Sequence, residues 1–365
     1  HRPSAAYPPS PGAHAVRMPP RLVLAALSLA VASASRAADP TAAAASLERA
    51  GATLVKDTAG TVTEVRFGKV VPADALAALP GLPGLTSVVL AGSDAGDAAV
   101  AAAAGLPGLR NLDLRDCNVT NAGLAPLATS RTLVALRLSG KSGATMVDDA
   151  GMVHLAKIPS LKTLMLDFLW VSEQGLETLA TLAGLEELTL AQSLAGDDAL
   201  PVIARRFPKL RRLRLARTQV TGAGLAALAP LEGLRDLDVS ECSQLDDAAL
   251  EPLGRLTGLV KLNLWRVPVG DAGIAHLAPL VNLQWLNVDN TRLSDDGLAA
   301  LAGMQKLAYL HAGSTAVSNA GVERLAGLKS LREVILTRTA VDAAGGAALQ
   351  EKLPAAKIVL EAADR

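Results

Sequence analysis

Residues 210–234 read LRRLRLARTQVTGAGLAALAPLEGL, and their pattern predicts one strand followed by one helix. Its leucines at positions 4 and 6, Leu213 and Leu215, alternate as the inward side chains of a short strand do. Thr221 stands where a helix would begin, and Thr is a good N-cap residue. Helical spacing follows in Leu225, Leu228 and Leu231. A unit this short cannot bury its own apolar face, so we expect it to stack on copies of itself.

The same unit recurs along the chain at steps of 23 to 28 residues, most of them 24 or 25. Its first positions are Val62, Leu85, Leu109, Leu133, Leu161, Leu185, Leu210, Leu234, Leu259, Leu283, Leu307 and Leu331, with a weaker copy at Ala355. Position 9 is small or polar, which suits bonding to neighbouring turns, in Cys117, Ser193, Thr218, Cys242, Thr291, Thr315 and Thr339. The 28-residue step adds about four residues within Gly140–Val147, so we expect a small loop there.

These motifs resemble the leucine-rich-repeat family, in particular a short bacterial variety whose unit reads LxxLxLxxTxVTDAGLxxLxxL. Residues 234–256, LRDLDVSECSQLDDAALEPLGRL, also resemble the cysteine-containing subtype. The resemblance covers about residues 60–365, with Thr, Ser or Cys where the commonest subtype has Asn. It implies an α/β fold, a right-handed βα horseshoe of about 12 repeats. Its parallel strands would line the concave face and its helices the convex face, and its function would be that of an interaction scaffold.

The N-terminal segment has the pattern of a secretory signal peptide. Met18 is expected to be the start, Arg21 supplies a charge, residues 22–32 are apolar, and small residues lead to cleavage after Ala34 or Ala37. The alternative is an Ala-rich disordered leader. We therefore expect disordered or upstream residues in 1–17, a signal peptide in 18–37, a cap in 38–60 and the repeat domain in 61–365. The mature protein would be exported to the periplasm, the cell surface or the medium, without a stable membrane span.

Charge and cysteine usage argue against nucleic-acid binding and against a disulfide. Residues 1–37 hold four arginines and no acid, so the remainder has 31 basic and 35 acidic residues, a net charge of −4. Proteins that bind nucleic acid usually carry a basic excess, so we expect no nucleic-acid partner. Cys117 and Cys242 lie five repeats apart, about 25 Å at the spacing of stacked strands, too far for a disulfide. We expect two buried free thiols.

The concave face is predicted to carry positions 3, 5 and 7 of each repeat. Three of the four Trp and Tyr residues after residue 37 fall there on consecutive repeats: Trp265, Trp285 and Tyr309. Polar residues accompany them: Asn263, Asn287, Asp289 and His311. Because Trp and Tyr are frequent in binding hot spots, we interpret these seven residues as a partner-binding patch. The alternative is that the rings only cover the exposed strands.

Charged residues on the same face fall into a sequence of alternating sign. Glu187, Arg212, Asp236 and Lys261 follow one another at position 3, and Arg214 stands beside Asp238 at position 5. Opposite charges on adjacent strands stabilise a sheet modestly, so we favour a self-neutralising ladder over a site for an acidic partner. The acid pairs Asp148-Asp149, Asp197-Asp198, Asp246-Asp247 and Asp295-Asp296 recur at helix starts, and we interpret them as capping residues.

No pattern of residues predicts catalysis. The Gly140-Lys141-Ser142 sequence resembles the end of a phosphate loop, but a repeat strand precedes it and a flexible insertion follows. The histidines lack partners at metal spacing, and His311 lacks a nucleophile. We therefore expect a monomeric, non-enzymatic binding protein without cofactors that recognises a protein or a glycan. One alternative is a structural or inhibitory scaffold that acts through its convex or terminal surfaces. Another is an enzyme, which would need a catalytic domain, and residues 38–60 are too short to form one. An adaptor of the F-box type would need a helical domain before the repeats.

Overall fold

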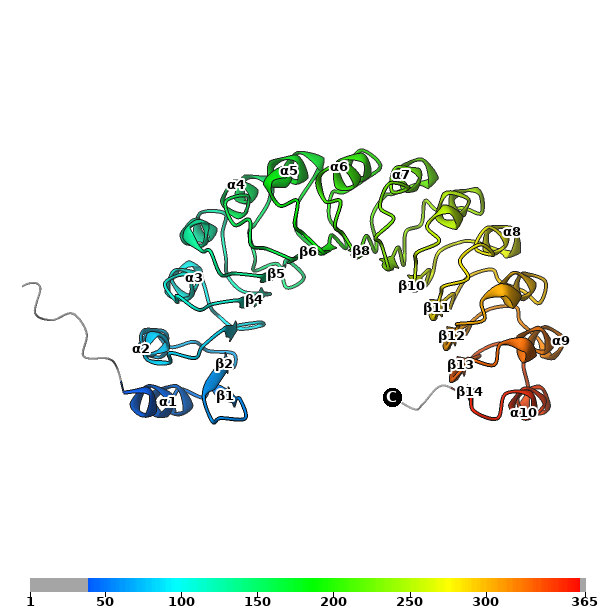
Figure 1. The fold of residues 1–365 in the computed structure, drawn as a ribbon, viewed down its shortest axis with the longest axis horizontal. Helices are drawn as coiled ribbons and strands as arrows, with labels where there is room; N and C mark the ends of the chain where they lie inside the picture. The colour runs from blue at the N-terminus through cyan, green and yellow to red at the C-terminus, as the bar shows by residue number, and fades with distance from the viewer. Residues whose placement is uncertain (1–38, 362–365) are drawn as a thin grey trace, which may run out of the picture.

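The computed structural model describes residues 39–361 and shows an open arc (Figure 1). Strands line the inner side of the arc and helices its outer side, so the predicted leucine-rich-repeat solenoid is confirmed. The strands form one 14-stranded sheet in which the spatial order equals the sequence order. Only β1 runs antiparallel, against β2, and every later pair is parallel.

Each strand is short because a repeat gives the sheet only its positions 3 to 7. The strands are β1 (Thr53–Lys56), β2 (Val62–Arg66), β3 (Ser87–Val89), β4 (Asn111–Arg115), β5 (Ala135–Ser139), β6 (Thr163–Asp167), β7 (Glu187–Thr189), β8 (Arg212–Arg214), β9 (Asp236–Asp238), β10 (Lys261–Asn263), β11 (Trp285–Asn287), β12 (Tyr309–His311), β13 (Glu333–Ile335) and β14 (Lys357–Val359). Neighbouring strands pair in register, so equal repeat positions lie beside each other, as in Lys261, Trp285 and Tyr309.

The outer side combines short α-helices with 3₁₀ turns. The α-helices are α1 (Pro40–Arg49), α2 (Ala73–Ala78), α3 (Asp97–Ala104), α4 (Met152–Leu155), α5 (Glu173–Thr178), α6 (Ala199–Arg206), α7 (Gly222–Ala226), α8 (Asp271–Ala275), α9 (Asn319–Val322) and α10 (Ala343–Lys352). The 3₁₀ segments are η1 (Leu79–Gly81), η2 (Ala122–Thr129), η3 (Asp149–Gly151), η4 (Leu179–Thr181), η5 (Ala248–Leu250), η6 (Pro252–Arg255), η7 (Gly297–Gly303) and η8 (Glu323–Gly327). The predicted helix thus becomes a bare 3₁₀ turn in several repeats.

The core is one continuous apolar layer between the sheet and the helices. Leu213 of β8, Leu215 just after it, and Leu225 and Leu228 of the outer side all belong to this layer and are fully buried. At the N-terminal end, α1 packs on α2 and β1 adds the antiparallel strand, in the segment expected to form a cap. At the other end α10 contacts β14. Within residues 39–361, no helix is both long and apolar enough to cross a membrane.

Both cysteines are buried free thiols, as predicted. The Cys117 Sγ donates to the Leu90 carbonyl at 3.0 Å, and the Cys242 Sγ donates to the Leu215 carbonyl at 3.1 Å. Each of these carbonyls belongs to the preceding repeat. A threonine at the same position can bond instead to a carbonyl of its own repeat, as the Thr218 hydroxyl does to Leu215 at 2.6 Å. A cysteine at position 9 therefore ties its repeat directly to the one before it.

The acid pairs do more than cap their own helices. Asp148 and Asp246 accept from backbone N–H groups of the turns they begin, at 2.9 Å each, and these two are caps as predicted. Other acids instead reach the next repeat, where their two carboxylate oxygens accept from the backbone N–H and the hydroxyl of a Ser or Thr. These bridges run from Asp97 to Thr120, Asp149 to Ser172, Asp197 to Thr221, Asp271 to Ser294 and Asp295 to Ser318. For Asp149, Asp197 and Asp295 the capping interpretation is wrong, because it considered each repeat alone.

The bridging acid also explains the glycine that recurs near the start of the outer segment in these repeats. A Cβ on Gly321 would lie 2.0 Å from the Asp295 Oδ1 of the preceding repeat. Gly224 and Gly297 face Asp197 and Asp271 in the same way, at 2.3 Å each. The carboxylate therefore occupies the space that any larger residue would need.

The four-residue insertion forms an exposed turn after β5, with Lys141, Ser142 and Gly143 at its tip. The Thr145 hydroxyl anchors it by bonding to the Cys117 and Ser139 carbonyls at 2.8 and 2.7 Å. The Ser142 backbone N–H donates to the Asp116 carboxylate at 3.0 Å. In a phosphate loop such a backbone N–H would bind the phosphate, but here the Ser142 N–H is already bonded to the Asp116 carboxylate.

Candidate functional site

The concave face carries the rows of side chains that the repeat positions predict. Because adjacent strands lie about 4.8 Å apart, equal positions on successive strands come into side-chain contact. The registers place Trp285 beside Tyr309 at position 3 and Asn287 beside His311 at position 5. Position 7 follows the three-residue strands, so Trp265, Asp289 and Gly313 lie just beyond β10, β11 and β12.

Trp285 and Tyr309 form a parallel stack with ring centroids 5.1 Å apart and an interplanar angle of 2°. The Lys261 ammonium lies 4.7 Å from the centroid of the Trp285 ring, so the Trp285 indole contacts a cation as well as the Tyr309 ring. Burial raises the pKa of Tyr309, and Glu333 and Asp289 add to the rise, so its hydroxyl stays protonated. The stack therefore offers a partner mainly its ring edges and the Tyr309 hydroxyl.

Trp265 is not part of this stack. Its position in the repeat is four residues further along the strand direction, about 13 Å at 3.3 Å per residue. The Arg266 guanidinium lies 5.4 Å from its ring centroid. The three aromatic residues predicted as one group are thus divided between two places on the concave face.

A pocket of about 480 Å³ lies along the position-7 row, and its lining extends from Arg115 past Phe168 to Trp265. Small residues, Ala191 and Ala216, form the part of its lining that lies between the repeats of Phe168 and Trp265, and they leave room there. Its charged lining residues are Arg115, Asp116, Lys141, Asp167, Arg214, Arg217 and Glu241. This arrangement suits an apolar side chain surrounded by polar contacts. The signal in the sequence was the run of small residues at position 7, which the prediction of the aromatic patch did not use.

The self-neutralising charge ladder is confirmed. The Arg212 guanidinium contacts Glu187 at 2.9 Å and Asp236 at 3.2 Å, and the Lys261 ammonium lies 3.8 Å from Asp236. Burial raises the pKa of Asp236, although Lys261 and Arg212 oppose the shift. In the pocket, Arg214 bonds to Asp167 at 2.6 Å and to Asp238 at 3.1 Å. Arg212 and Arg214 are therefore neutralised by neighbouring carboxylates, as the ladder interpretation expects.

The polar residues of the predicted patch are largely engaged by the protein itself. The Asn263 and Asn287 side-chain oxygens accept from the N–H groups of Trp265 and Asp289, at 3.1 and 2.9 Å. The His311 Nε2 lies 3.8 Å from Asp289 Oδ1, which is buried without a hydrogen-bond partner among the described residues. Burial lowers the pKa of His311, so its imidazole is neutral at pH 7. Within residues 39–361 no three His, Cys, Asp or Glu side chains gather into a metal site.

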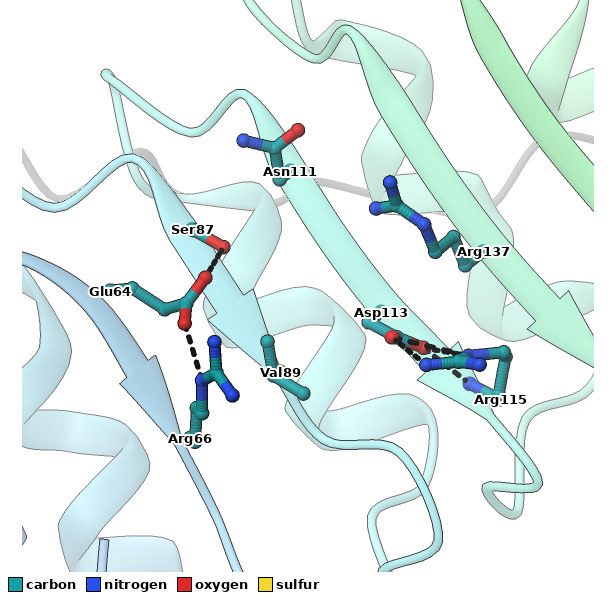
Figure 2. A pocket seen from close by; sticks show the side chains of 8 residues that line it. All are labelled: Glu64, Arg66, Ser87, Val89, Asn111, Asp113, Arg115 and Arg137. Carbon is teal, nitrogen blue, oxygen red and sulfur yellow. Dashed lines mark hydrogen bonds and ion pairs between the residues drawn. The ribbon is translucent and has the colours of Figure 1, made fainter. Parts of the chain in front are cut away.

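A second concave pocket, of about 460 Å³, lies over β2 to β5 near the N-terminal end (Figure 2). Figure 2 shows Arg66 bonded to Glu64 and Arg115 bonded to Asp113, at 2.5 and 2.7 Å. Arg137, from β5, lies beside Asp113 of β4 and makes no ion pair with the residues that the structure describes. The sequence did not single out this pocket, because its residues come from four strands and form no local motif.

Comparisons with known proteins agree with this architecture. The profile of the leucine-rich-repeat family, described as "Leucine Rich repeat", matches residues 108–128 and 208–229. Two segments of the chain thus match leucine-rich repeats, and its fold is that of a leucine-rich-repeat solenoid. Among solved structures it is similar to an internalin (inlF) from Listeria monocytogenes str. 4b F2365, with 19% identity and a TM-score of 0.59 over 89% of this chain and 95% of that one. It is also similar to the protein chain of a TLR13–ssRNA13 complex, with 20% identity and a TM-score of 0.57 over 82% of this chain and 43% of that one.

These similarities identify the fold of the chain and do not identify its ligand. No curated protein sequence matches the chain. The candidate site therefore has to be sought in side chains of the concave face. These form the Phe168–Trp265 pocket, the Trp285–Tyr309 stack and the pocket that Arg137 helps to line.

Proposed function

We propose that this protein is a non-catalytic, exported binding protein that recognises a protein partner through its concave face. The observation that carries the proposal is the pocket of about 480 Å³ that extends past Phe168 to Trp265. A partner side chain inserted there would contact Trp265 and lie on Ala191 and Ala216 within reach of Arg214. Buried aromatic anchors of this kind dominate protein interfaces. The Trp285–Tyr309 stack, Asn263, Asn287, Asp289 and His311 would form the outer part of the same interface.

The charges of the concave face favour a protein over a nucleic acid. Arg212, Arg214 and Arg217 each have a carboxylate neighbour within 3.2 Å. Such paired bases release few counterions when a phosphate backbone approaches. The single-stranded RNA of the TLR13 complex is a ligand of that protein. For this chain we expect no binding of single-stranded RNA at physiological salt.

Export rests on the sequence of residues 18–37, which lie outside the described residues. Cleavage near Ala34 or Ala37 would release a chain that begins just before α1 (Pro40–Arg49), followed by the cap in 38–60 and the repeats in 61–365. Mass spectrometry of the protein recovered outside the cytoplasm tests this. Retention of residues 22–32 in that protein would contradict it.

The concave site is tested by affinity capture from the native envelope and culture medium with purified mature protein. Trp265→Ala removes one wall of the pocket, and Ala216→Trp fills it. We expect both variants to weaken binding of the captured partner at least about tenfold, as loss of a hot spot does. Val281→Ala, at an exposed residue, is the matched control and should bind as the wild type does.

Two results would overturn the proposal. One is a partner that binds both pocket variants with wild-type affinity. The other is a glycan array on which the wild-type protein binds sugars while no protein is captured. The second outcome would transfer the site to carbohydrate recognition.

A further inference from the structure

Three exposed apolar side chains lie in a row outside the concave face. Trp170 is 74% exposed, Met146 69% and Leu194 56%, the highest exposures among the large apolar residues apart from Val70. All three occupy position 10 of the repeat, in the loop between strand and helix, in three consecutive repeats. We call this row the edge stripe. Trp170 is the one tryptophan that the concave-face prediction left out.

The backbone fixes the stripe in register. Thr120 pairs with Met146 and Asp148 pairs with Trp170 in isolated parallel bridges. The Met146 N–H donates to the Val119 carbonyl at 2.8 Å, and the Leu194 N–H donates to the Val171 carbonyl at 3.1 Å. Successive stripe residues therefore lie one repeat apart, about 5 Å at the backbone. The four-residue insertion before Met146 leaves this register intact.

Among the repeats from Leu85 onward, large apolar residues at position 10 are confined to these three; the first copy, at Val62, has the half-buried Val71 there. Elsewhere the position holds polar or small residues: Asp94, Asn118, Gln219, Ser243, Pro268, Arg292, Ala316 and Ala340. The repeat therefore does not require an apolar residue here, and folding does not bury one. Contiguous exposed apolar side chains on a soluble protein mark interaction surfaces.

One exposed or half-buried acid follows each residue of the edge stripe in the chain. Asp148, Glu173 and Asp198 follow the three stripe residues by two to four positions, at the start of the outer segment of each repeat. None of them forms an ion pair with a residue that the structure describes. Lys141, the base nearest to Met146 in the sequence, lines the concave pocket instead. Asp148 also accepts hydrogen bonds from the Ala150 N–H and the Asn121 amide, at 2.9 and 2.7 Å. Acids without a neutralising base, next to exposed apolar side chains, give charge complementarity to a partner that carries cations.

We propose that the edge stripe is a second docking surface, for a protein segment that presents bulky apolar side chains together with Lys or Arg. Its apolar groups cover Met146, Trp170 and Leu194, and its cations pair with Asp148, Glu173 and Asp198. Trp170 is the central contact, since Trp is the residue most enriched in hot spots. The acids disfavour an anionic membrane surface, and they also disfavour a second copy that would bring the same acids. This surface is separate from the concave pocket and does not depend on the proposed function.

The test uses two synthetic amphipathic peptides with the same Leu and Trp residues, one with Lys and one with Glu at its polar positions. Binding to the mature protein is followed by fluorescence polarisation. We expect the Lys peptide to bind at least tenfold more tightly than the Glu peptide. Trp170→Gln, which copies Gln219, and the triple variant Asp148→Asn, Glu173→Gln, Asp198→Asn should each weaken binding of the Lys peptide at least tenfold.

Matched variants separate the stripe from general charge and from the concave site. Asp296→Asn removes an exposed acid at the repeat position of Asp198, and Trp265→Ala alters only the concave pocket; both should bind the Lys peptide as the wild type does. Equal binding of the Lys peptide by wild type and Trp170→Gln would overturn the proposal. So would equal binding of the two peptides, or a wild-type dimer in light scattering that Trp170→Gln dissociates. Circular dichroism of each variant verifies its fold.

Discussion

The thiols of Cys117 and Cys242 show how burial controls reactivity at single residues. Both side chains are fully buried, and burial raises the pKa of each thiol above its ordinary value. His311 illustrates the same physics for a base, because burial lowers its pKa although Asp289 and Glu333 oppose the shift. In each case the neutral form is favoured, since a charge loses its hydration when it is buried.

We expect neither cysteine to react with Ellman's reagent in the folded protein, and both to react after denaturation. The thiolate is the reactive species, and a raised pKa together with burial removes it at neutral pH. Spectrophotometric counting of thiols with and without urea measures this. Rapid reaction of either thiol in the native protein would show that its repeat opens locally.

His311→Gln should make the stability of the protein less dependent on pH. In wild type the unfolded chain takes up a proton near the ordinary histidine pKa of 6.5, while the folded chain takes it up only at lower pH. The unfolded state therefore binds more protons in that window, and the free energy of unfolding falls as the pH falls. Urea titrations between about pH 7.5 and about pH 5 measure the slope. Equal slopes for the two proteins would show that His311 keeps its ordinary pKa.

At the scale of elements, the stacking of repeats depends on polar ladders as well as on leucines. The Asp295 carboxylate accepts from the Ser318 N–H at 2.7 Å and from its hydroxyl at 2.6 Å. The same contact recurs along the outer edge, and the glycine beside each acid makes room for it. A helix of four or five residues has little stability of its own, so these bonds to the preceding repeat supply part of it.

The pair Asp295 and Asp296 offers a matched experiment. Asp295→Ala leaves two donors of Ser318 without a partner and should cost about 1–3 kcal/mol in the free energy of unfolding. Asp296 is exposed and reaches only Arg324, at 3.4 Å, so Asp296→Ala should change stability by less than about 0.5 kcal/mol. Chemical denaturation of both variants measures the difference. Similar losses for the two would mean that the ladder contributes no more than surface charge.

The whole molecule is held by one core that runs from α1 to β14 without interruption. In such an array each repeat contacts only its neighbours, so stability is close to a sum over repeats and their interfaces. The concave face is uninterrupted along its length, because no segment of residues 39–361 folds back across the sheet (Figure 1).

Leu237→Ala in the middle of the array should lower the free energy of unfolding by about 2–5 kcal/mol, because it removes a fully buried side chain and leaves a cavity. Val281→Ala serves as the control at an exposed site and should have little effect. Equilibrium urea unfolding followed by circular dichroism measures both. A loss below about 1 kcal/mol for Leu237→Ala would show that the array relaxes around the cavity.

The sequence by itself determined the repeat, its strands and helices, the buried thiols and the concave charge ladder. Each of these follows from a periodic pattern or from the pairing of equal repeat positions, so local spacing is sufficient to predict it. Tertiary structure decided what depends on distances between repeats. It stacked Trp285 on Tyr309 and left Trp265 out of the stack, which depends on how side chains of neighbouring repeats are oriented. Tertiary structure also showed that acids at the helix starts bond to the next repeat. Trp170, Met146 and Leu194 lie exposed in the loops between strand and helix, and the periodicity of apolar residues could not predict their exposure.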